Sequence, residues 1–340
     1  MSDKVTMRDI AREMNVSAVT VSKALANKDG VGRELREAII KKAAEMGYNY
    51  VSSAERDYAV GKTGNIGILI AERFLSDDAF YSSLYRQILT SAAERGYSTI
   101  MEIVTPEQER NNILPQIVRG HKVDGIIFMG QIDRQYIITV VTEGLPFVFL
   151  DFYDEVYLND VVLTDNTYGA YQLTSYLIKR GHRRIGFVGS LNATSSILDR
   201  YLGMYRAMLR NGLEVKKEWI LDDRDSSGKF GRLTLPEDMP EAFVCNCDNV
   251  ACVLVDMLKA AGYRVPEDVS VVGFDDHVCA EQCEPKLTTY RVDMKGLGET
   301  TVMMIINQIT EGTHTRGATI VSGSFIERES VALRTNKQTS

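Results

Sequence analysis

The sequence predicts a small helical head followed by an α/β body built of two similar lobes. Residues 1 to about 50 contain three short stretches with apolar residues at helical spacing. From residue 65 onward, near-continuous apolar runs alternate with helical patterns, which is typical of a parallel sheet covered by helices on both faces. This alternation restarts near residue 165, so we expect two doubly wound lobes.

Length and composition narrow the class of protein. The chain has 340 residues, enough for two or three domains, and no apolar run long enough to span a membrane. The first residues lack the apolar stretch of a secretory signal, and five cysteines is an odd number, so we expect a cytoplasmic protein with reduced thiols. Residues 1–62 carry 11 basic and 9 acidic side chains, whereas residues 63–340 carry 28 and 37. A slightly basic head on an acidic body is compatible with a head that meets nucleic acid.

The head has the spacing of a helix-turn-helix. Thr6 can cap a first helix, and a short turn at Asn15-Val16 follows. Ser17 can cap a second helix over 18–26, and a third helix is predicted over 33–46. Two short helices joined by a tight turn, with a third that closes the core, indicate a DNA-binding head. On spacing alone, a plain three-helix bundle without nucleic acid is equally compatible.

The body is predicted element by element from the same patterns. The expected strands are 66–71, 98–101, 123–129, 147–151, 185–188, 242–245, 269–274, 318–322 and 325–327. The expected helices are 81–95, 106–119, 135–143, 166–180, 199–210, 249–261 and 296–310. Ligands in such folds bind outside the carboxyl ends of the strands, so the cleft between the lobes is the expected ligand site.

The amino-acid sequence resembles that of the LacI/GalR family of transcription regulators over essentially its whole length. The strings that carry the resemblance in the head are Val5–Ala11, Asn15–Asn27 and Arg36 to Tyr48. In the body they are Asp165-Asn166 with Gly169, Gly181–Gly189, Arg200 with Gly203, and Val265–Asp276. The fold implied for the body is that of type I periplasmic binding proteins, with crossovers between lobes near Thr164, Arg291 and Ser322.

The resemblance implies a division of the chain. It places the helix-turn-helix domain at 1–50, a hinge at 51–64, and an effector-binding and dimerisation domain at 65–340. Lobe 1 would cover about 65–163 and 292–322, and lobe 2 about 164–291 and 323–340. The hinge sequence differs from the family pattern in two ways. Tyr50 replaces a proline, and the segment has one residue more than the family pattern. With that extra residue placed before Arg56, Tyr58 matches the leucine that enters the minor groove in the family.

The resemblance also implies the residues that meet DNA. The second helix would lie in the major groove, with Ala18, Val19 and Lys23 at base edges. Thr20 and Ser22 would lie nearer the phosphates. The full set expected at the DNA is Thr6, Ser17, Ala18, Val19, Thr20, Ser22, Lys23, Asn27 and Tyr58.

Candidate ligand residues carry over by position in the same way, and they are Phe80, Tyr81, Asp151, Arg200, Asp248 and Asp275. Carboxylates and a guanidinium suit sugar hydroxyls or a purine edge, and aromatic rings suit the flat face of either. Asp248 and Asp275 could instead cap helices or accept hydrogen bonds within loops. Phe80 and Tyr81 could instead pack in the hydrophobic core. Two departures make an inherited sugar specificity unsafe. Cys247 replaces the family's asparagine, and the stretch 225–240 is shorter than the helix usual there.

No motif indicates catalysis, a cofactor or a metal. The four histidines are scattered, and the pairs Cys245/Cys247 and Cys279/Cys283 fit buried thiols better than a zinc site. The absence of such motifs favours a non-enzyme. The resemblance implies a repressor that binds a near-palindromic operator and is controlled by a small molecule, most simply a sugar. The alternatives are a solute-binding protein without DNA function and a sugar-processing enzyme.

The resemblance implies a homodimer. The residues after Leu333 are all polar and contain no heptad repeat, so we expect the assembly to stop at the dimer. The dimer surface should lie on the body. Leu84, Ile88 and Leu89 are candidates for it, although they could equally be core residues.

Overall fold

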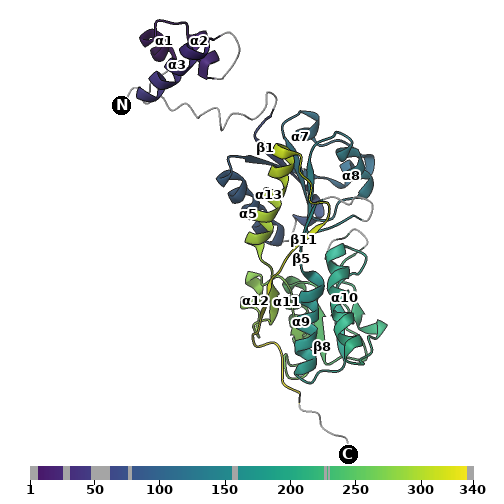
Figure 1. Cartoon of the computed structure of the whole chain (residues 1–340). Coiled ribbons are helices and arrows are strands. Elements are labelled where there is room, and N and C mark those ends of the chain that lie inside the picture. The colour runs from purple at the N-terminus through teal and green to yellow at the C-terminus, as the bar shows by residue number, and fades with distance from the viewer. Residues whose placement is uncertain are drawn as a thin grey trace, which may run out of the picture. The chain divides into compact units, whose positions relative to one another are not determined.

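The computed structural model describes residues 7–25, 31–46, 62–75, 79–154, 160–225, 228 and 230–334 (Figure 1). Thr6, Asn27, Tyr58 and the hinge predicted at 51–64, apart from its last three residues, lie outside these ranges. The chain divides into two compact units, residues 1–63 and residues 64–340, and each is described by itself.

The first unit is the predicted three-helix head. Its helices are α1 (Met7–Glu13), α2 (Ala18–Leu25) and α3 (Arg33–Glu45). One buried apolar residue from each helix illustrates the shared core: Ile10, Val21 and Ile39 are each 0% exposed. The turn between α1 and α2 is tight because Asn15 adopts a left-handed conformation, φ 51°, which asparagine tolerates better than most residues.

Lobe 1 of the body is built on a six-stranded parallel sheet. Its strands are β1 (Asn65–Ala71), β2 (Ser98–Val104), β3 (Gly125–Met129), β4 (Phe147–Leu150), β5 (Val161–Thr164) and β11 (Ala318–Val321), in the order β11-β5-β4-β3-β1-β2. Its helical elements are η1 (Glu72–Phe74), α5 (Ala79–Glu94), α6 (Pro106–Asn111), α7 (Gln116–Arg119), α8 (Arg134–Val141) and α13 (Met294–Glu311). In Figure 1, α5 and α13 lie side by side, consistent with their close packing.

Lobe 2 is built on a four-stranded parallel sheet. Its strands are β6 (Ile185–Val188), β7 (Ile220–Leu221), β8 (Ala242–Cys245) and β9 (Ser270–Val272), in the order β7-β6-β8-β9. Its helical elements are α9 (Asn166–Lys179), α10 (Ser195–Arg210), η2 (Lys217–Trp219), α11 (Asp248–Ala260) and α12 (Val278–Gln282). A large apolar core joins β6, β8 and β9 to α11 and α12.

Three segments connect the two sheets. The chain crosses from β5 to α9 after Thr164, from β10 (Thr289–Arg291) to α13, and from β11 to β12 (Ser324–Ile326). Strands β10 and β12 pair antiparallel, so two of the three crossovers form one ribbon. A helix-turn-helix head with a body of two doubly wound lobes is therefore confirmed as the fold.

Several predicted elements were wrong in their bounds. The single helix predicted over 106–119 is two helices, because Asn112 ends α6 in a left-handed conformation and Pro115 precedes α7. Helix α10 begins four residues before the predicted start, because the Thr194 hydroxyl accepts a hydrogen bond from the Ile197 amide. The short elements β5, β7, β10 and α12 were not predicted.

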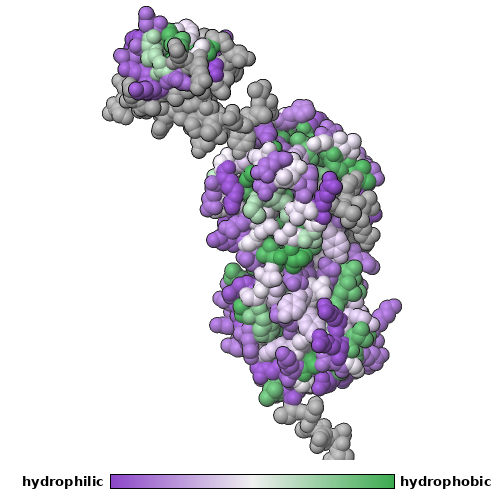
Figure 2. Space-filling model, viewed as in Figure 1, coloured by the Kyte–Doolittle hydropathy of each residue, from purple (hydrophilic) through white to green (hydrophobic). Residues whose placement is uncertain are grey.

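The exposed apolar residues of the body are the candidates for a dimer surface. Figure 2 shows that hydrophilic residues cover most of the visible face of the body and that hydrophobic residues form separate patches. Leu84 and Ile88 are 0% exposed, so they belong to the core and not to a dimer surface. Leu89 on α5 is 43% exposed and Met303 on α13 is 52% exposed. Within the described ranges, no helix is both long and apolar enough to cross a membrane.

Candidate functional site

The head presents one polar side of α2. Val21 and Ala24 are buried in the three-helix core, whereas Ser17 and Lys23 are exposed and Thr20 is half-buried. Ser17 caps the helix because its hydroxyl accepts a hydrogen bond from the Thr20 amide at 3.0 Å. Ala18, Val19 and Ser22 also belong to α2. The exposed Lys23 and the half-buried Thr20 therefore lie on the helix that the family resemblance assigns to DNA, and the exposed Ser17 caps it.

The body holds a narrow cavity between its lobes, with room for about 40 Å³ of water. Five of the six predicted ligand residues line it: Phe80, Tyr81, Asp151, Arg200 and Asp275. The other lining residues are Phe74, Thr194, Ser196, Ile197, Arg224, Asn246 and Cys247. Asp151, which follows β4, and residues of η1 and α5 form the lobe 1 wall. The start of α10 and the loops after β7, β8 and β9 form the lobe 2 wall.

Lobe 2 holds its arginine by several contacts at once. The Arg200 Nε donates to Asn166 Oδ1 at 2.8 Å, and Nη1 donates to the Asn246 carbonyl oxygen. Nη2 lies 3.3 Å from Asp275 Oδ1 in an ion pair whose side chains are 7% and 8% exposed. The guanidinium carbon lies 3.9 Å from the centre of the Phe274 ring. Arg200 is therefore fixed in orientation before any ligand binds.

Lobe 1 supplies aromatic rings and one carboxylate. The Tyr81 hydroxyl donates to Asp151 Oδ2 at 2.8 Å, and both side chains are buried. Phe74 and Phe80 each lie 5.1 Å from the Tyr81 ring, centre to centre. Phe80 and Tyr81 thus pack in the core and face the cavity as well, so the two readings of these residues are compatible.

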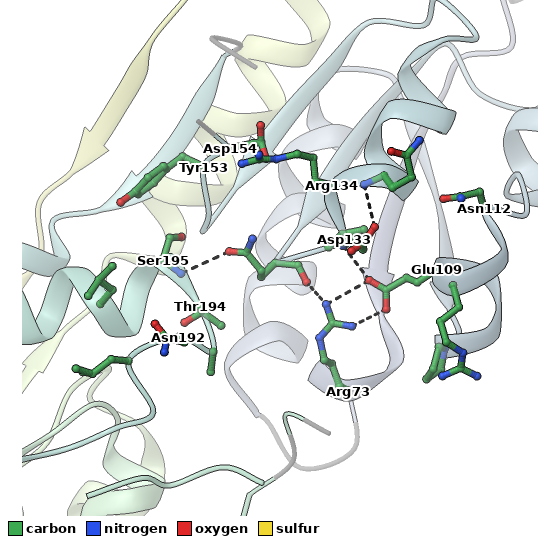
Figure 3. A pocket seen from close by; sticks show the side chains of 18 residues that line it. Arg73, Glu109, Asn112, Asp133, Arg134, Tyr153, Asp154, Asn192, Thr194 and Ser195 are labelled. Carbon is green, nitrogen blue, oxygen red and sulfur yellow. Dashed lines mark hydrogen bonds and ion pairs between the residues drawn. The ribbon is translucent and has the colours of Figure 1, made fainter. Parts of the chain in front are cut away.

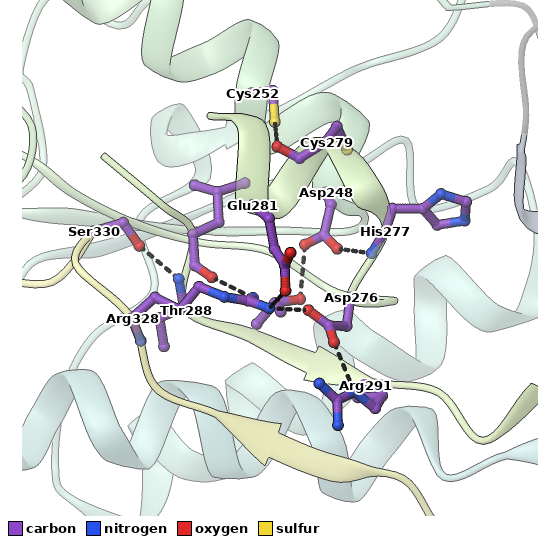
Figure 4. A network of polar contacts seen from close by, with 12 residues as sticks. Asp248, Cys252, Asp276, His277, Cys279, Glu281, Thr288, Arg291, Arg328 and Ser330 are labelled. Atoms are coloured by element: carbon purple, nitrogen blue, oxygen red, sulfur yellow. Dashed lines mark hydrogen bonds and ion pairs between the residues drawn. The ribbon is translucent and has the colours of Figure 1, made fainter. Parts of the chain in front are cut away.

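Asp248 does not line the cavity, which corrects its assignment to the ligand. Its carboxylate accepts hydrogen bonds from the Thr289 hydroxyl at 2.7 Å and from the His277 amide at 2.8 Å (Figure 4). The side chain is 0% exposed, and burial raises the pKa of the carboxyl to about 7. A Cβ on Gly273 would meet Asp248 Oδ1 at 2.0 Å, so the glycine allows this packing. Asp248 therefore links α11 to the loop after β9. This is the alternative in which the carboxylate accepts hydrogen bonds within a loop.

Arg224 and Asn246 line the cavity and were missed. Arg224 stacks on Phe230, with 4.6 Å from its guanidinium carbon to the ring centre. The Asn246 amide donates to Asp223 Oδ2 at 2.7 Å and to the Val188 carbonyl. The only signal available was the run Asp222-Asp223-Arg224 at the end of a strand. That strand, β7, has two residues and gave no apolar run to recognise.

A larger cavity of about 830 Å³ (Figure 3) shares Thr194 with the first. Its rim is polar and paired. Arg73 forms an ion pair with Glu109 at 2.5 Å, and Arg134 forms one with Asp154 at 2.7 Å. The Ser195 amide of lobe 2 donates to the Gln131 side chain of lobe 1 at 3.4 Å. The rim thus bridges the two lobes with polar groups.

The cysteines form no metal centre. All five are free thiols, and Cys245 is buried while the others are half-buried. The Cys252 thiol donates to the Cys279 carbonyl oxygen at 3.4 Å, and the Cys279 thiol to Asn249 Oδ1 at 3.1 Å. No cluster of three or more potential metal ligands occurs in the part of the chain that the structure describes.

Comparisons with known proteins agree with both units. The model of bacterial regulatory proteins of the lacI family matches residues 6–49, and that of periplasmic binding protein-like domains matches residues 174–331. The chain belongs to the LacI family of DNA-binding transcription regulators. It is 28% identical over 333 residues to the transcriptional repressor PurR of Photobacterium profundum, covering 96% of this chain and 98% of that protein. It is 27% identical over 339 residues to PurR of Haemophilus influenzae, with the same coverage.

Solved structures share the fold. A complex of the regulator CelR with cellobiose matches with a TM-score of 0.70 at 24% identity, covering 96% of this chain and 99% of that one. The Lac repressor dimer bound to operator and an anti-inducer matches with a TM-score of 0.71 at 23% identity, covering 97% and 100%. The similarity extends through head and body, so this LacI-family chain has the full two-part architecture.

Proposed function

We propose that this LacI-family regulator is a homodimeric repressor that binds a near-palindromic operator through α2 and is released or retained by a small polyhydroxylated effector. The observation that carries the proposal is the convergence of five predicted side chains on one cavity between the lobes. Such a regulator acts where the DNA is, in the bacterial cytoplasm.

The chemistry of the cavity favours a sugar or a sugar derivative. Asp151 and Asp275 are acceptors that suit vicinal hydroxyls, and Arg200 offers a fixed donor fork. Phe74, Phe80 and Tyr81 provide rings for the flat face of a ligand. A purine has the same edge-and-face character. The named relatives are PurR repressors, and one structural neighbour holds cellobiose, so both ligand classes need testing.

The effector is best sought by thermal shift of the full-length protein against mono- and disaccharides, sugar phosphates and purine bases. Binding to the native state raises the melting temperature by mass action. We expect one class to stabilise the wild type and to leave Arg200→Ala unshifted. If every ligand that shifts the wild type shifts Arg200→Ala equally, the effector binds elsewhere. Conversion of a stabilising ligand into product would favour the enzyme alternative instead.

The operator is best found by selection from random double-stranded DNA with the purified dimer. We expect a near-palindromic motif, and we expect Val19→Ala and Lys23→Ala to change the preferred bases in each half-site, since one good base contact is worth ~1–3 kcal/mol. Thr20→Ala should weaken all sequences alike, because phosphate contacts carry no sequence information. Identical motifs for wild type, Val19→Ala and Lys23→Ala would contradict this reading of α2. Failure to enrich any motif would favour the solute-binding alternative.

A further inference from the structure

The loop after β9 carries two adjacent aspartates in an unusual conformation. Asp275 has φ 104° and Asp276 has φ 57°, both in the region that L-residues rarely adopt. Asp275 faces the cavity and pairs with Arg200. Asp276 does not line either of the two cavities between the lobes. Because this backbone is unfavourable by itself, the contacts of the two side chains must hold it.

Asp276 bridges two arginines, one on each carboxylate oxygen (Figure 4). Its Oδ2 accepts from Arg291 Nε at 2.7 Å, and its Oδ1 accepts from Arg328 Nη2 at 2.7 Å. The side chains of Asp276 and Arg328 are 7% and 10% exposed, so this pair is largely shielded from water. Arg328 is held further by its Nη1, which donates to the Leu287 carbonyl at 2.9 Å. Charge-assisted bonds in such a setting fix the positions of their partners.

The two arginines belong to two different connections between the lobes. Arg291 is the last residue of β10, directly before the crossover to α13. Arg328 lies two residues beyond the end of β12, the strand that follows the crossover from β11. Strands β10 and β12 pair with each other, with Arg291 opposite Ser324. One carboxylate therefore ties both crossovers to the loop that carries the ligand-facing Asp275.

The backbone reinforces this connection. The Asp275 amide donates to the Tyr290 carbonyl at 2.8 Å, and the Val292 amide donates to the Asp275 carbonyl at 3.3 Å. Helix α13 begins at Met294, two residues beyond Val292, and packs on α5 and on the sheet of lobe 1. A displacement of the loop is thus transmitted through a short, hydrogen-bonded path to lobe 1.

We propose that Asp276 is a positioning residue that couples the ligand-facing loop to the angle between the lobes. It does not touch the ligand. It makes the β10–β12 ribbon follow any movement of Asp275, so that occupancy of the cavity sets the arrangement of the lobes. This role rests on the proposed function of the cavity as an effector site.

The test measures the lobe arrangement directly and needs neither effector nor operator. Spin labels on non-natural amino acids at Glu143 and Glu214, exposed sites in lobe 1 and lobe 2, report the distance between lobes in the full-length protein. We expect a narrow distance distribution for the wild type and a broadened or shifted one for Asp276→Asn. Hydrogen exchange at the Val292 amide should become about tenfold faster. Asp268→Asn is the matched control, because it removes an exposed ion pair with Arg264 in the same lobe.

A second variant separates coupling from simple stability. Asp276→Asn leaves the shielded Arg328 paired with the exposed Glu281 at 3.2 Å. Combining it with Arg328→Met removes both members of the shielded pair, so the melting temperature should recover. The distance distribution should stay broad. A wild-type distribution in Asp276→Asn at full folding, or a narrow distribution regained in the double variant, would overturn the proposal. Either result would leave the effector proposal itself standing, since that proposal is tested by ligand-induced stabilisation.

Discussion

The two walls of the cavity between the lobes are built differently. The lobe 2 wall is polar and rigid, since Arg200 is held by Asn166, Asn246, Asp275 and the Phe274 ring. The lobe 1 wall is mostly aromatic, with the Tyr81–Asp151 hydrogen bond as its polar element. Aromatic surface tolerates different ligands, whereas a fixed guanidinium and carboxylate demand hydroxyls or amides in set positions. If the cavity holds the effector as proposed, the comparison predicts that lobe 2 sets the ligand specificity and that lobe 1 contributes less to it.

The largest expected effect comes from removing the centre of the lobe 2 wall. Arg200→Ala deletes the ligand donor and leaves Asp275 without its ion-pair partner at 3.3 Å. Two hydrogen bonds from the charged guanidinium to the ligand are worth ~1.5–3 kcal/mol each, so effector affinity should fall by at least about a hundredfold. Titration calorimetry with the effector found by thermal shift measures this. Arg210→Ala, an exposed site on the same helix, is the control, and an equal loss in both variants would remove the distinction.

Asp275→Asn tests the lobe 2 wall by a smaller change to the side chain. The amide keeps the size of the side chain but loses the charge that pairs with Arg200, so one oriented acceptor is weakened. We expect a loss of effector affinity of ~1.5–3 kcal/mol, the range for hydrogen bonds to charged groups. Calorimetry should find operator affinity without effector close to that of the wild type. Wild-type effector affinity in this variant would mean that Asp275 only holds its loop.

Tyr81→Phe probes the lobe 1 wall and should have a weaker effect. It removes the hydrogen bond to Asp151 at 2.8 Å and keeps the ring. A loss of ~1 kcal/mol in effector affinity is expected, about fivefold. If Tyr81→Phe costs as much as Arg200→Ala, the two walls contribute equally and the comparison fails.

Asp248→Asn should act on stability and not on the ligand. Burial raises the pKa of this carboxyl to about 7, so the folded state binds its proton more tightly than the unfolded state does. The wild type therefore loses stability as the pH rises from about 4 to about 7. The asparagine variant has no titrating carboxyl at this position. The unfolding free energy of the wild type minus that of the variant should therefore fall by more than ~1 kcal/mol as the pH rises over that range. Urea unfolding at pH 5 and pH 8 measures it. If the wild type instead gains stability relative to the variant as the pH rises, the Asp248 carboxyl does not have a raised pKa.

The sequence was sufficient for features encoded locally. Buried apolar strands such as Ile185–Val188 and Ala242–Cys245 were predicted with the bounds that the structure shows. The capped helix after Asp165 was also predicted, because the cap residue and the apolar stripe lie within a few residues of each other. Short elements were missed for the opposite reason. Strand β7 has two residues and forms only because β6 offers a free edge beside it.

The ligand residues show the same limit. Family wording indicated the carboxylates after strands, but it could not tell Asp248 from Asp275. Asp248 is the first residue of α11 and turns into the lobe, where Thr289 and His277 take up its oxygens. Asp275 reaches the cavity because its backbone adopts φ 104°. That difference depends on the packing of loops distant in sequence, which no local pattern records.

The central claim is that occupancy of the cavity between the lobes controls operator binding by the head. It is tested most directly by titrating the effector into the complex of the full-length protein with its selected operator, for wild type and Arg200→Ala in parallel. We expect the effector to change the operator affinity of the wild type by about 5- to 150-fold, the usual range for coupled sites, and to leave that of Arg200→Ala unchanged. An equal change in both proteins, or none in the wild type at saturating effector, would contradict it.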